Sequence, residues 1–187
     1  MSLICFLNGS LARERVKEDY GLEWSDFDRV GLARTPAGNE GRVMLPFFGP
    51  EITPRVDSAD AIYHGWADNQ RDPASVVRAL LEGQFLNMKI HSRWLGVAPE
   101  SIYLTGGASK NDGIAQTVAD VFGAPVSRLS VAGSAALGAA IRAAHGGCGI
   151  PLEDLEAAFC QPEADSTVTP GDGTEKIYEE LEQKWVS

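Results

Sequence analysis

A short segment near the middle of the chain sets the strongest limit on its fold. Residues 101–105 form a compact apolar run, Gly106 and Gly107 follow it, and a helical pattern comes next. A glycine pair between a strand and a helix lets the backbone approach a ligand with no Cβ in the way. The free N–H groups at the start of the helix favour an anion such as phosphate. The segment therefore indicates either a phosphate-binding turn or a tight strand-to-helix connection without a ligand.

The side chains of this turn add to the first interpretation. Ala108 and Ser109 lie in the turn, and Asn111, at the start of the helix, offers both a hydrogen-bond donor and an acceptor. These groups suit the α-phosphate and the ribose or adenine edge of a nucleotide. The GxxxxGK[ST] pattern of a Walker A loop is absent.

Strand and helix patterns alternate around the turn. A long helix is predicted to begin at Asp72-Pro73, because Asp is a good N-cap and Pro suits the first helical position. The helix after Asn111 should end at Gly123, and a second strand is predicted at 126–129. This order favours an α/β fold in which strands 101–105 and 126–129 pair in parallel.

Two further segments complete this pattern: one that is rich in small residues, and one at the N-terminus. Residues 133–144 predict a helix that Gly146-Gly147 would end, and whose small side chains suit tight packing or a flat ring. Residues 3–7 are an apolar run that predicts a buried strand, followed by a helix at 11–17 with Leu11 and Val16 on its buried side.

The segments between are less regular. Ser25 or Asp26 is predicted to cap a short helix, and the Pro- and Gly-rich residues 35–60 should form loops with a short strand at 43–45.

Residues 1–160 are assigned to one domain and residues 161–187 to an acidic tail. The tail regains apolar residues only near its end, so it is either a linker with a docking helix or partly disordered.

Composition excludes several classes of function. The formal net charge of −10 argues against nucleic acid as a partner, because phosphate backbones need clustered Lys and Arg. No uncharged apolar run approaches the ~20 residues that cross a membrane, and no secretory signal is visible. The three cysteines have no metal-ligand spacing, which suggests reduced thiols in the cytoplasm.

Several blocks together resemble the FGGY family of carbohydrate kinases. The C-terminal signature of that family is similar to GGASKN at 106–111, AQTVADVFGAPV at 115–126 and GSAALGAAIRAA at 133–144. Three more blocks resemble xylulokinases: CFLNGSLARERV at 5–16, EITP at 51–54 and VRALLEGQF at 77–85. The resemblance covers about residues 3–146, in the order that the family has.

The resemblance implies an actin-like, ribonuclease H-like domain that forms one wall of a cleft. ATP with Mg²⁺ would lie on this wall, and the sugar would lie on an N-terminal domain that this chain lacks. Gly106, Gly107 and Asn111 match nucleotide contacts of the family, and Ala108 lies in the same turn. Trp24 resembles an aromatic residue that flanks adenine, although core packing explains it equally well. D-Xylulose is the implied substrate, with ribulose, glycerol or another polyol as alternatives.

The sequence departs from the family pattern in one respect. The family's catalytic base is an Asp in a Gly-Asp step upstream of the segment that resembles residues 5–16, and nothing precedes that segment here. The similar Gly171-Asp172-Gly173-Thr174 lies in the tail, where Thr174 is better explained as a helix cap. We therefore expect the chain alone to be inactive and to lack the first two strands of its sheet. Strand 3–7 would then have an open edge that favours a homodimer or a rearrangement.

Two other classes of function stay open. The chain could be a nucleotide-binding module without catalysis, such as a partner subunit. It could also be a scaffold that binds no nucleotide, in which Gly106-Gly107 is purely a turn.

Overall fold

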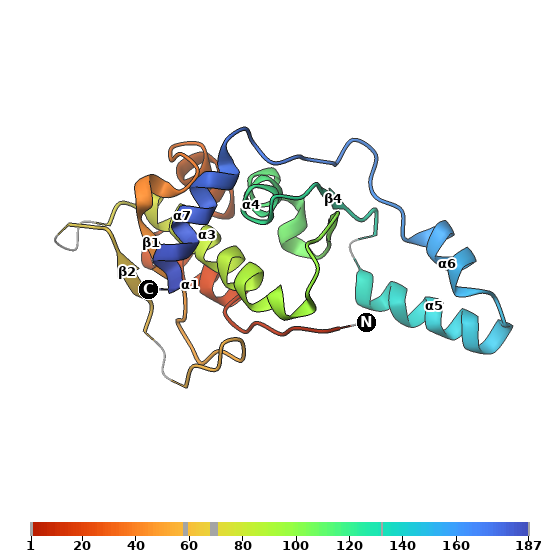
Figure 1. Ribbon diagram of the computed structural model, residues 1–187. Coiled ribbons are helices and arrows are strands. Elements are labelled where there is room, and N and C mark those ends of the chain that lie inside the picture. Colours follow the sequence, from red (N-terminus) through yellow and green to blue (C-terminus); the bar gives the residue numbers. More distant parts are fainter. Residues whose placement is uncertain (1, 58–59, 68–70, 132, 187) are drawn as a thin grey trace.

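The computed structural model describes residues 2–57, 60–67, 71–131 and 133–186 (Figure 1). Helices alternate with short strands in a mixed α/β arrangement. In chain order, the elements are α1 (Ser10–Asp19), α2 (Trp24–Asp26), the π-helix η1 (Phe27–Leu32), η2 (Asn39–Gly41), β1 (Val43–Leu45), β2 (Ile62–His64), α3 (Pro73–Ser92), η3 (Arg93–Leu95), β3 (Ile102–Leu104), η4 (Gly107–Lys110), α4 (Asp112–Phe122), β4 (Val126–Arg128), α5 (Ser134–Cys148), α6 (Leu152–Phe159) and α7 (Thr174–Val186).

Helix α3 is the centre of the core, and its prediction is confirmed. The Asp72 carboxylate caps it by accepting a hydrogen bond from the Ser75 amide at 3.0 Å, and Pro73 is its first residue. Every residue from 75 to 87 is buried, because η1, β1, α4 and α7 surround the helix. The sequence pattern of one apolar stripe therefore understates how deeply α3 is enclosed.

Close backbone contact joins α3 to the antiparallel pair β1–β2. The register pairs Met44 with Tyr63, and Met44 is fully buried. A Cβ at Gly83 of α3 would overlap the carbonyl oxygen of Met44 and stand 3.2 Å from Cδ of Pro46. Only glycine allows this approach, so Gly83 fixes the depth at which the hairpin sits.

Strands β3 and β4 pair in parallel, as predicted. Ile102 lies opposite Val126 and Leu104 opposite Arg128, with α4 as the crossover between them. Asn111 caps α4, and Gly123 ends it with a φ of 68°. The strand edge beyond β4 is occupied by the tail, because Val126 also forms an antiparallel bridge with Val168.

The predicted strand at 3–7 is wrong. Residues 2–6 make no strand pairing with any other described residue, and the side chains of Leu3 and Leu7 are 81% and 51% exposed. The amide of Leu7 donates instead to Oε1 of Glu51 at 2.7 Å. A carboxylate has replaced a neighbouring strand as the acceptor at this end of the segment.

Helix α1 confirms the predicted helix but turns a different side inward. Ala12 and Val16 are almost fully buried, whereas Leu11 is 69% exposed.

The predicted cap of the next helix, α2, is also corrected. Glu23 precedes α2, and its amide donates to Oδ2 of Asp26 at 2.8 Å.

Helices α5 and α6 lie apart from the rest of the fold and pack against each other (Figure 1). Helix α5 continues through Gly146 and Gly147, which were predicted to end it, and stops where Gly149 has a φ of 67°. Leu155 of α6 is the buried residue of this pair, and none of the described residues of α5 is buried. The small side chains of α5 therefore do not serve tight packing against the body of the fold.

The acidic tail ends in a docked helix. Tyr178, Leu181 and Trp185 of α7 are buried against the region of α3, α4 and β1. The ring of Trp185 meets that of Phe47 edge-on, with centroids 6.2 Å apart. Of the two alternatives for the tail, the docking helix describes residues Thr174–Val186. No described helix is both long and apolar enough to span a bilayer.

Candidate nucleotide-binding site

A pocket of about 550 Å³ lies between the N-terminal helices and the turn that follows β3. Three separate stretches of the chain contribute to its walls. They are Ser10, Arg13 and Glu14 of α1, Trp24 of α2 with Phe27 of η1, and Thr105, Gly107, Ala108, Asn111 and Ile114 around the glycine turn. The volume is in the range of a small-molecule site, which is typically ~300–1,000 Å³.

The pocket brings together four of the five residues singled out from the sequence. Trp24, Gly107, Ala108 and Asn111 all line it. Gly106 does not. It has φ 84° and ψ −173°, a conformation open almost only to glycine, and it turns the chain from β3 into η4. Gly106 thus shapes the turn, whereas Gly107 borders the cavity.

Gly107 differs from most turn glycines because its surroundings do not require it. Its φ is outside the left-handed region, and a Cβ built there would meet no heavy atom within 4 Å. Gly107 therefore leaves open space on the pocket side, where a ligand could approach the backbone.

One wall of the pocket is aromatic. The ring of Trp24 is 49% exposed and lies over that of Phe27, with centroids 5.4 Å apart and a tilt of 38° between the planes. Phe27 is buried at 2% exposure and anchors the indole. Trp24 thus has a supported face and an accessible surface, an arrangement that fits stacking against a planar ring.

The charged side chains that line the pocket are Arg13 and Glu14. Arg13 has no ion-pair partner within 4.0 Å among the described residues, and burial lowers the pKa of its guanidinium. Lys17, one turn further along α1, places its Nζ 5.9 Å from the centroid of the Trp24 ring. A partly buried guanidinium without a counter-ion favours an anionic ligand.

Asn111 is held by bonds on both sides of its amide. Its Oδ1 accepts from the Ile114 amide at 2.7 Å, as the cap of α4, and its Nδ2 donates to Oδ2 of Asp28 at 2.6 Å. Burial raises the pKa of Asp28, although hydrogen bonds from the Gly113 amide and Asn111 oppose this shift. Asp28 was missed in the sequence, where its only signal is that it stands four residues after Trp24.

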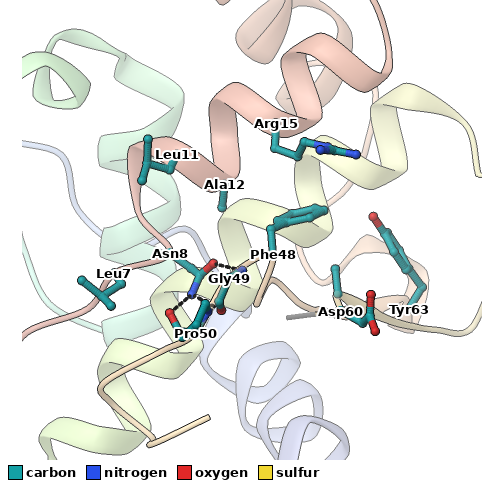
Figure 2. A pocket seen from close by; sticks show the side chains of 11 residues that line it. Leu7, Asn8, Leu11, Ala12, Arg15, Phe48, Gly49, Pro50, Asp60 and Tyr63 are labelled. Carbon is teal, nitrogen blue, oxygen red and sulfur yellow. Dashed lines mark hydrogen bonds between the residues drawn. The ribbon is translucent and has the colours of Figure 1, made fainter. Parts of the chain in front are cut away.

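A second hollow, of about 700 Å³, lies on the other side of α1 (Figure 2). The side chain of Asn8 shapes this hollow, because its Nδ2 donates to the carbonyl oxygens of Gly49 at 3.1 Å and Pro50 at 3.3 Å. Arg15 also lines this hollow, but its Nε lies 2.9 Å from Oδ2 of Asp19. The guanidinium here already has a counter-ion, so this hollow suits a nucleotide less well than the first one.

The sequence Gly171-Asp172-Gly173-Thr174 lies elsewhere. These residues line a hollow at the start of α7 that shares no residue with the pocket beside the glycine turn. The Gly171 amide donates to Oδ1 of Asp120 at 2.8 Å, and the Thr174 hydroxyl donates to the Gly171 carbonyl at 2.7 Å. The segment therefore forms the turn into α7.

Comparison with known proteins identifies the family. The C-terminal domain of the FGGY family of carbohydrate kinases matches residues 6–147. The chain belongs to the FGGY family of carbohydrate kinases, as its sequence blocks predicted.

Two curated relatives of the chain are xylulose kinases. The chain is 38% identical to the xylulose kinase of Rattus norvegicus over all of its own length and 37% of the relative's. It is 33% identical to xylulose kinase 2 of Arabidopsis thaliana over 83% of its own length and 32% of the relative's. It therefore spans about a third of the length of these relatives.

Solved structures confirm the actin-like fold of this family. A ligand-bound xylulose kinase from Lactobacillus acidophilus superimposes with a TM-score of 0.84 at 23% identity, covering 97% of this chain and 37% of the other. A glycerol kinase from Plasmodium falciparum with ADP gives a TM-score of 0.73 at 19% identity, covering 96% and 36%. These similarities establish the architecture, and the predicted α/β class is confirmed.

Proposed function

We propose that this chain is the nucleotide-binding part of an ATP-dependent carbohydrate kinase. The observation that carries the proposal is the position of Gly107, which borders the pocket although neither its φ nor its neighbours require a glycine. A glycine kept free of protein contacts, beside an aromatic wall and the Arg13 guanidinium, suits a nucleotide that passes close to the backbone.

Each wall of the pocket then has a role in binding. The exposed face of Trp24 stacks on adenine, supported from beneath by Phe27. Gly107, Ala108 and Asn111 lie along the sugar and α-phosphate, at the positive end of the α4 dipole. Arg13 supplies a positive charge for the phosphates, and Gly106 sets the turn.

Magnesium would arrive with the nucleotide. Among the described residues, no three His, Cys, Asp or Glu side chains gather into a group that could hold a metal ion. Mg²⁺ commonly keeps several waters and is held by phosphates with one or two carboxylates, and Glu14 is the carboxylate that lines this pocket. When bound, Mg²⁺ would neutralise charge on the phosphates.

The reaction that fits this family is transfer of the γ-phosphoryl group of ATP to a sugar hydroxyl. A carboxylate takes the proton of the attacking hydroxyl, the new O–P bond forms, and the bond to ADP breaks. We place that carboxylate, and the sugar, on a domain outside residues 1–187, so that the chain alone binds nucleotide without transferring phosphate. The segment 171–174 lines a different hollow, so we do not assign this role to Asp172.

D-Xylulose is the substrate we propose, with D-xylulose 5-phosphate as product. The support is the similarity of the chain to xylulose kinases from rat, mouse and Arabidopsis. Ribulose, glycerol or another polyol is the alternative, and substrate profiling of a chain that includes the sugar-binding domain would separate them. We also propose a cytoplasmic location, in keeping with free thiols at Cys5, Cys148 and Cys160.

A non-catalytic nucleotide-binding subunit is the second candidate. Titration of the chain with Mg-ADP by calorimetry tests what both candidates share. We expect saturable binding, which Trp24→Ala weakens by about 5- to 150-fold, because stacking on a base contributes about 1–3 kcal/mol. Trp94→Ala is the matched control, since Trp94 is 64% exposed and does not line the pocket.

The alternatives are separated by two further results. A folded chain that binds no Mg-ADP would favour the scaffold hypothesis, in which the glycine pair is only a turn. Mg-ADP binding that is equally tight in Trp24→Ala would contradict the stacking role of Trp24. Phosphoryl transfer to xylulose by the isolated chain would contradict the proposal that the base lies outside it.

A further inference from the structure

We propose that Asp28 is a positioning residue for the nucleotide site, acting through Asn111. It holds the two walls of the pocket together: the helical segment that carries Trp24 and the turn that carries Gly107. We call the contact of Asp28 with Asn111 and Gly113 the latch. The nature of the ligand rests on the proposed function, whereas the latch itself rests on contacts within the chain.

The latch is a continuous chain of hydrogen bonds. Oδ2 of Asp28 accepts from Nδ2 of Asn111 at 2.6 Å, and Oδ1 of Asn111 accepts from the Ile114 amide at 2.7 Å. Asp28 also accepts a bond from the amide of Gly113. Both of these partners of the Asp28 side chain belong to the start of α4.

Asp28 and Trp24 share one piece of the chain. Trp24 begins α2, η1 follows without a break at Phe27, and Asp28 is the second residue of η1. Residues four apart on a helical segment lie on the same side. A bond that fixes Asp28 against α4 thus fixes Trp24 relative to Gly107.

Gly113 allows this close approach. A Cβ at position 113 would overlap Cδ1 of Leu32 and stand 2.6 Å from Oδ1 of Asp28. The φ of Gly113 is outside the left-handed region, so its backbone conformation does not require a glycine. The absence of a side chain at Gly113 instead makes room for η1, which packs directly against the backbone of α4.

The charge of Asp28 is not used in an ion pair. No described Lys, Arg or His lies within 4.0 Å of its carboxylate, and the residue is only partly exposed. A carboxylate accepts strongly but donates nothing, so it orients the Asn111 amide with nitrogen towards Asp28 and oxygen towards Ile114. One hydrogen of Nδ2 and one lone pair of Oδ1 stay available to a ligand in the pocket that Asn111 lines.

Asp28→Asn is the primary test, because it keeps the shape of the side chain but places an amide group against an amide. We expect faster hydrogen exchange of the Gly113 and Ile114 amides and a Kd for Mg-ADP raised by about tenfold. In an Asn111→Ala background, Asp28→Asn should raise the Kd no further, because the residue through which it acts is gone. Asp26→Asn is the control, since Asp26 bonds the Glu23 amide and Arg29 rather than α4.

A swapped variant separates the latch from a general loss of folding. Asp28→Asn combined with Asn111→Asp can remake every bond in reverse. The carboxylate introduced at position 111 would accept from the amide nitrogen introduced at position 28 and from the Ile114 amide, and the new amide oxygen at position 28 would accept from Gly113. Slow exchange should return in this double variant. If it unfolds together with the single variant, Asp28 is required for folding and the proposal fails.

The readouts keep this proposal distinct from the proposed function. Normal exchange in Asp28→Asn overturns the latch whatever the nucleotide does, and an equal rise in Kd with and without Asn111 overturns the route through Asn111. If the wild-type chain binds no Mg-ADP, the proposed function fails, and exchange rates alone decide whether Asp28 holds the two walls together.

Discussion

The hydroxyl of Tyr178 donates a hydrogen bond to Oε1 of Glu82 at 2.8 Å, and both side chains are almost completely buried. The same oxygen accepts from the Gly38 amide at 2.8 Å, and Nη1 of Arg78 lies 3.8 Å away. One carboxylate thus joins α7, α3 and the loop before β1. Burial of Tyr178 raises the pKa of its hydroxyl, so it stays protonated and remains a donor.

Removing the Tyr178 hydroxyl should loosen α7. Tyr178→Phe keeps the ring but leaves Glu82 with one donor fewer, and we expect the free energy of unfolding to fall by about 1–3 kcal/mol. Urea denaturation measures the change. Tyr103→Phe, at a residue that is 52% exposed, is the matched control. Equal stability of the two variants would show that the buried bond adds nothing.

Glu82 should make stability fall as pH rises. Burial raises its pKa from 4.5 to about 7, against the opposing effects of Arg78, Tyr178 and the Gly38 amide. The folded state therefore holds a proton that the unfolded state has released, and the stabilisation present below about pH 4.5 is lost by about pH 7. Glu82→Gln should flatten this part of the stability curve. A curve of unchanged slope in that variant would assign the pH dependence to other groups.

Glu51 should act in the opposite sense. Burial opposes its ionisation, but hydrogen bonds from the Asn8 and Leu7 amides, the Asn8 side chain and the Ile52 amide outweigh burial and lower its pKa. Its stabilisation is therefore present above pH 4.5, the unfolded value, and is lost as pH falls through the lowered pKa.

Glu51→Gln tests this arrangement, because an amide nitrogen would then face backbone donors. We expect a loss of about 2–4 kcal/mol at pH 7, measured by denaturant titration, and a smaller effect in acid. Glu18→Gln, on the exposed side of α1, should cost little. A loss that stays constant down to low pH would mean that the ionised carboxylate is not what stabilises this turn.

Gly113→Ala should separate η1 from α4. The new methyl group would overlap Leu32 and crowd Asp28, so we expect a loss of about 1–3 kcal/mol and weaker Mg-ADP binding. Gly138→Ala is the same change in α5, where a Cβ meets no heavy atom within 4 Å, and it should stabilise by roughly 0.5–1 kcal/mol. Thermal melts of both variants measure the difference, and destabilisation by both would point to helix effects unrelated to the pocket.

The chain should also self-associate. Leu3 and Leu7 are exposed on a segment that pairs with no other described strand, and a second copy could pair with it. We expect a dimer by size-exclusion chromatography with light scattering, weakened by Leu3→Asp. A monomer across the accessible concentrations would contradict this prediction.

Local signals in the sequence predicted much of the fold. Asp72-Pro73 at the start of α3, Gly123 at the end of α4 and the apolar runs of β3 and β4 act over a few residues, so pattern alone identifies them. The strand expected at residues 3–7 failed because a strand depends on a partner elsewhere. Helix α6 was not predicted, although acidic residues occupy its first turn.

The site divides in the same way. Gly107, Ala108 and Asn111, which line the candidate pocket, could be singled out because they lie close together in the sequence, and Trp24 was singled out through the family resemblance. Asp28 was missed because its bond to Asn111 spans 83 residues and no local pattern marks it. The buried Glu82 was likewise invisible, since its donors at Gly38 and Tyr178 come from opposite directions along the chain.

The position of α7 has a consequence for biosynthesis. Tyr178 is made 96 residues after Glu82, and ribosomes add about 5–20 residues per second, so α3 waits about 5–20 s for the helix that completes its surroundings. During that interval Glu82 lacks the Tyr178 donor, and the apolar groups that Leu181 and Trp185 later cover stay open to solvent. The nascent chain therefore passes through a stage at which the α7-facing side of α3 is uncovered, and the arrival of α7 ends it.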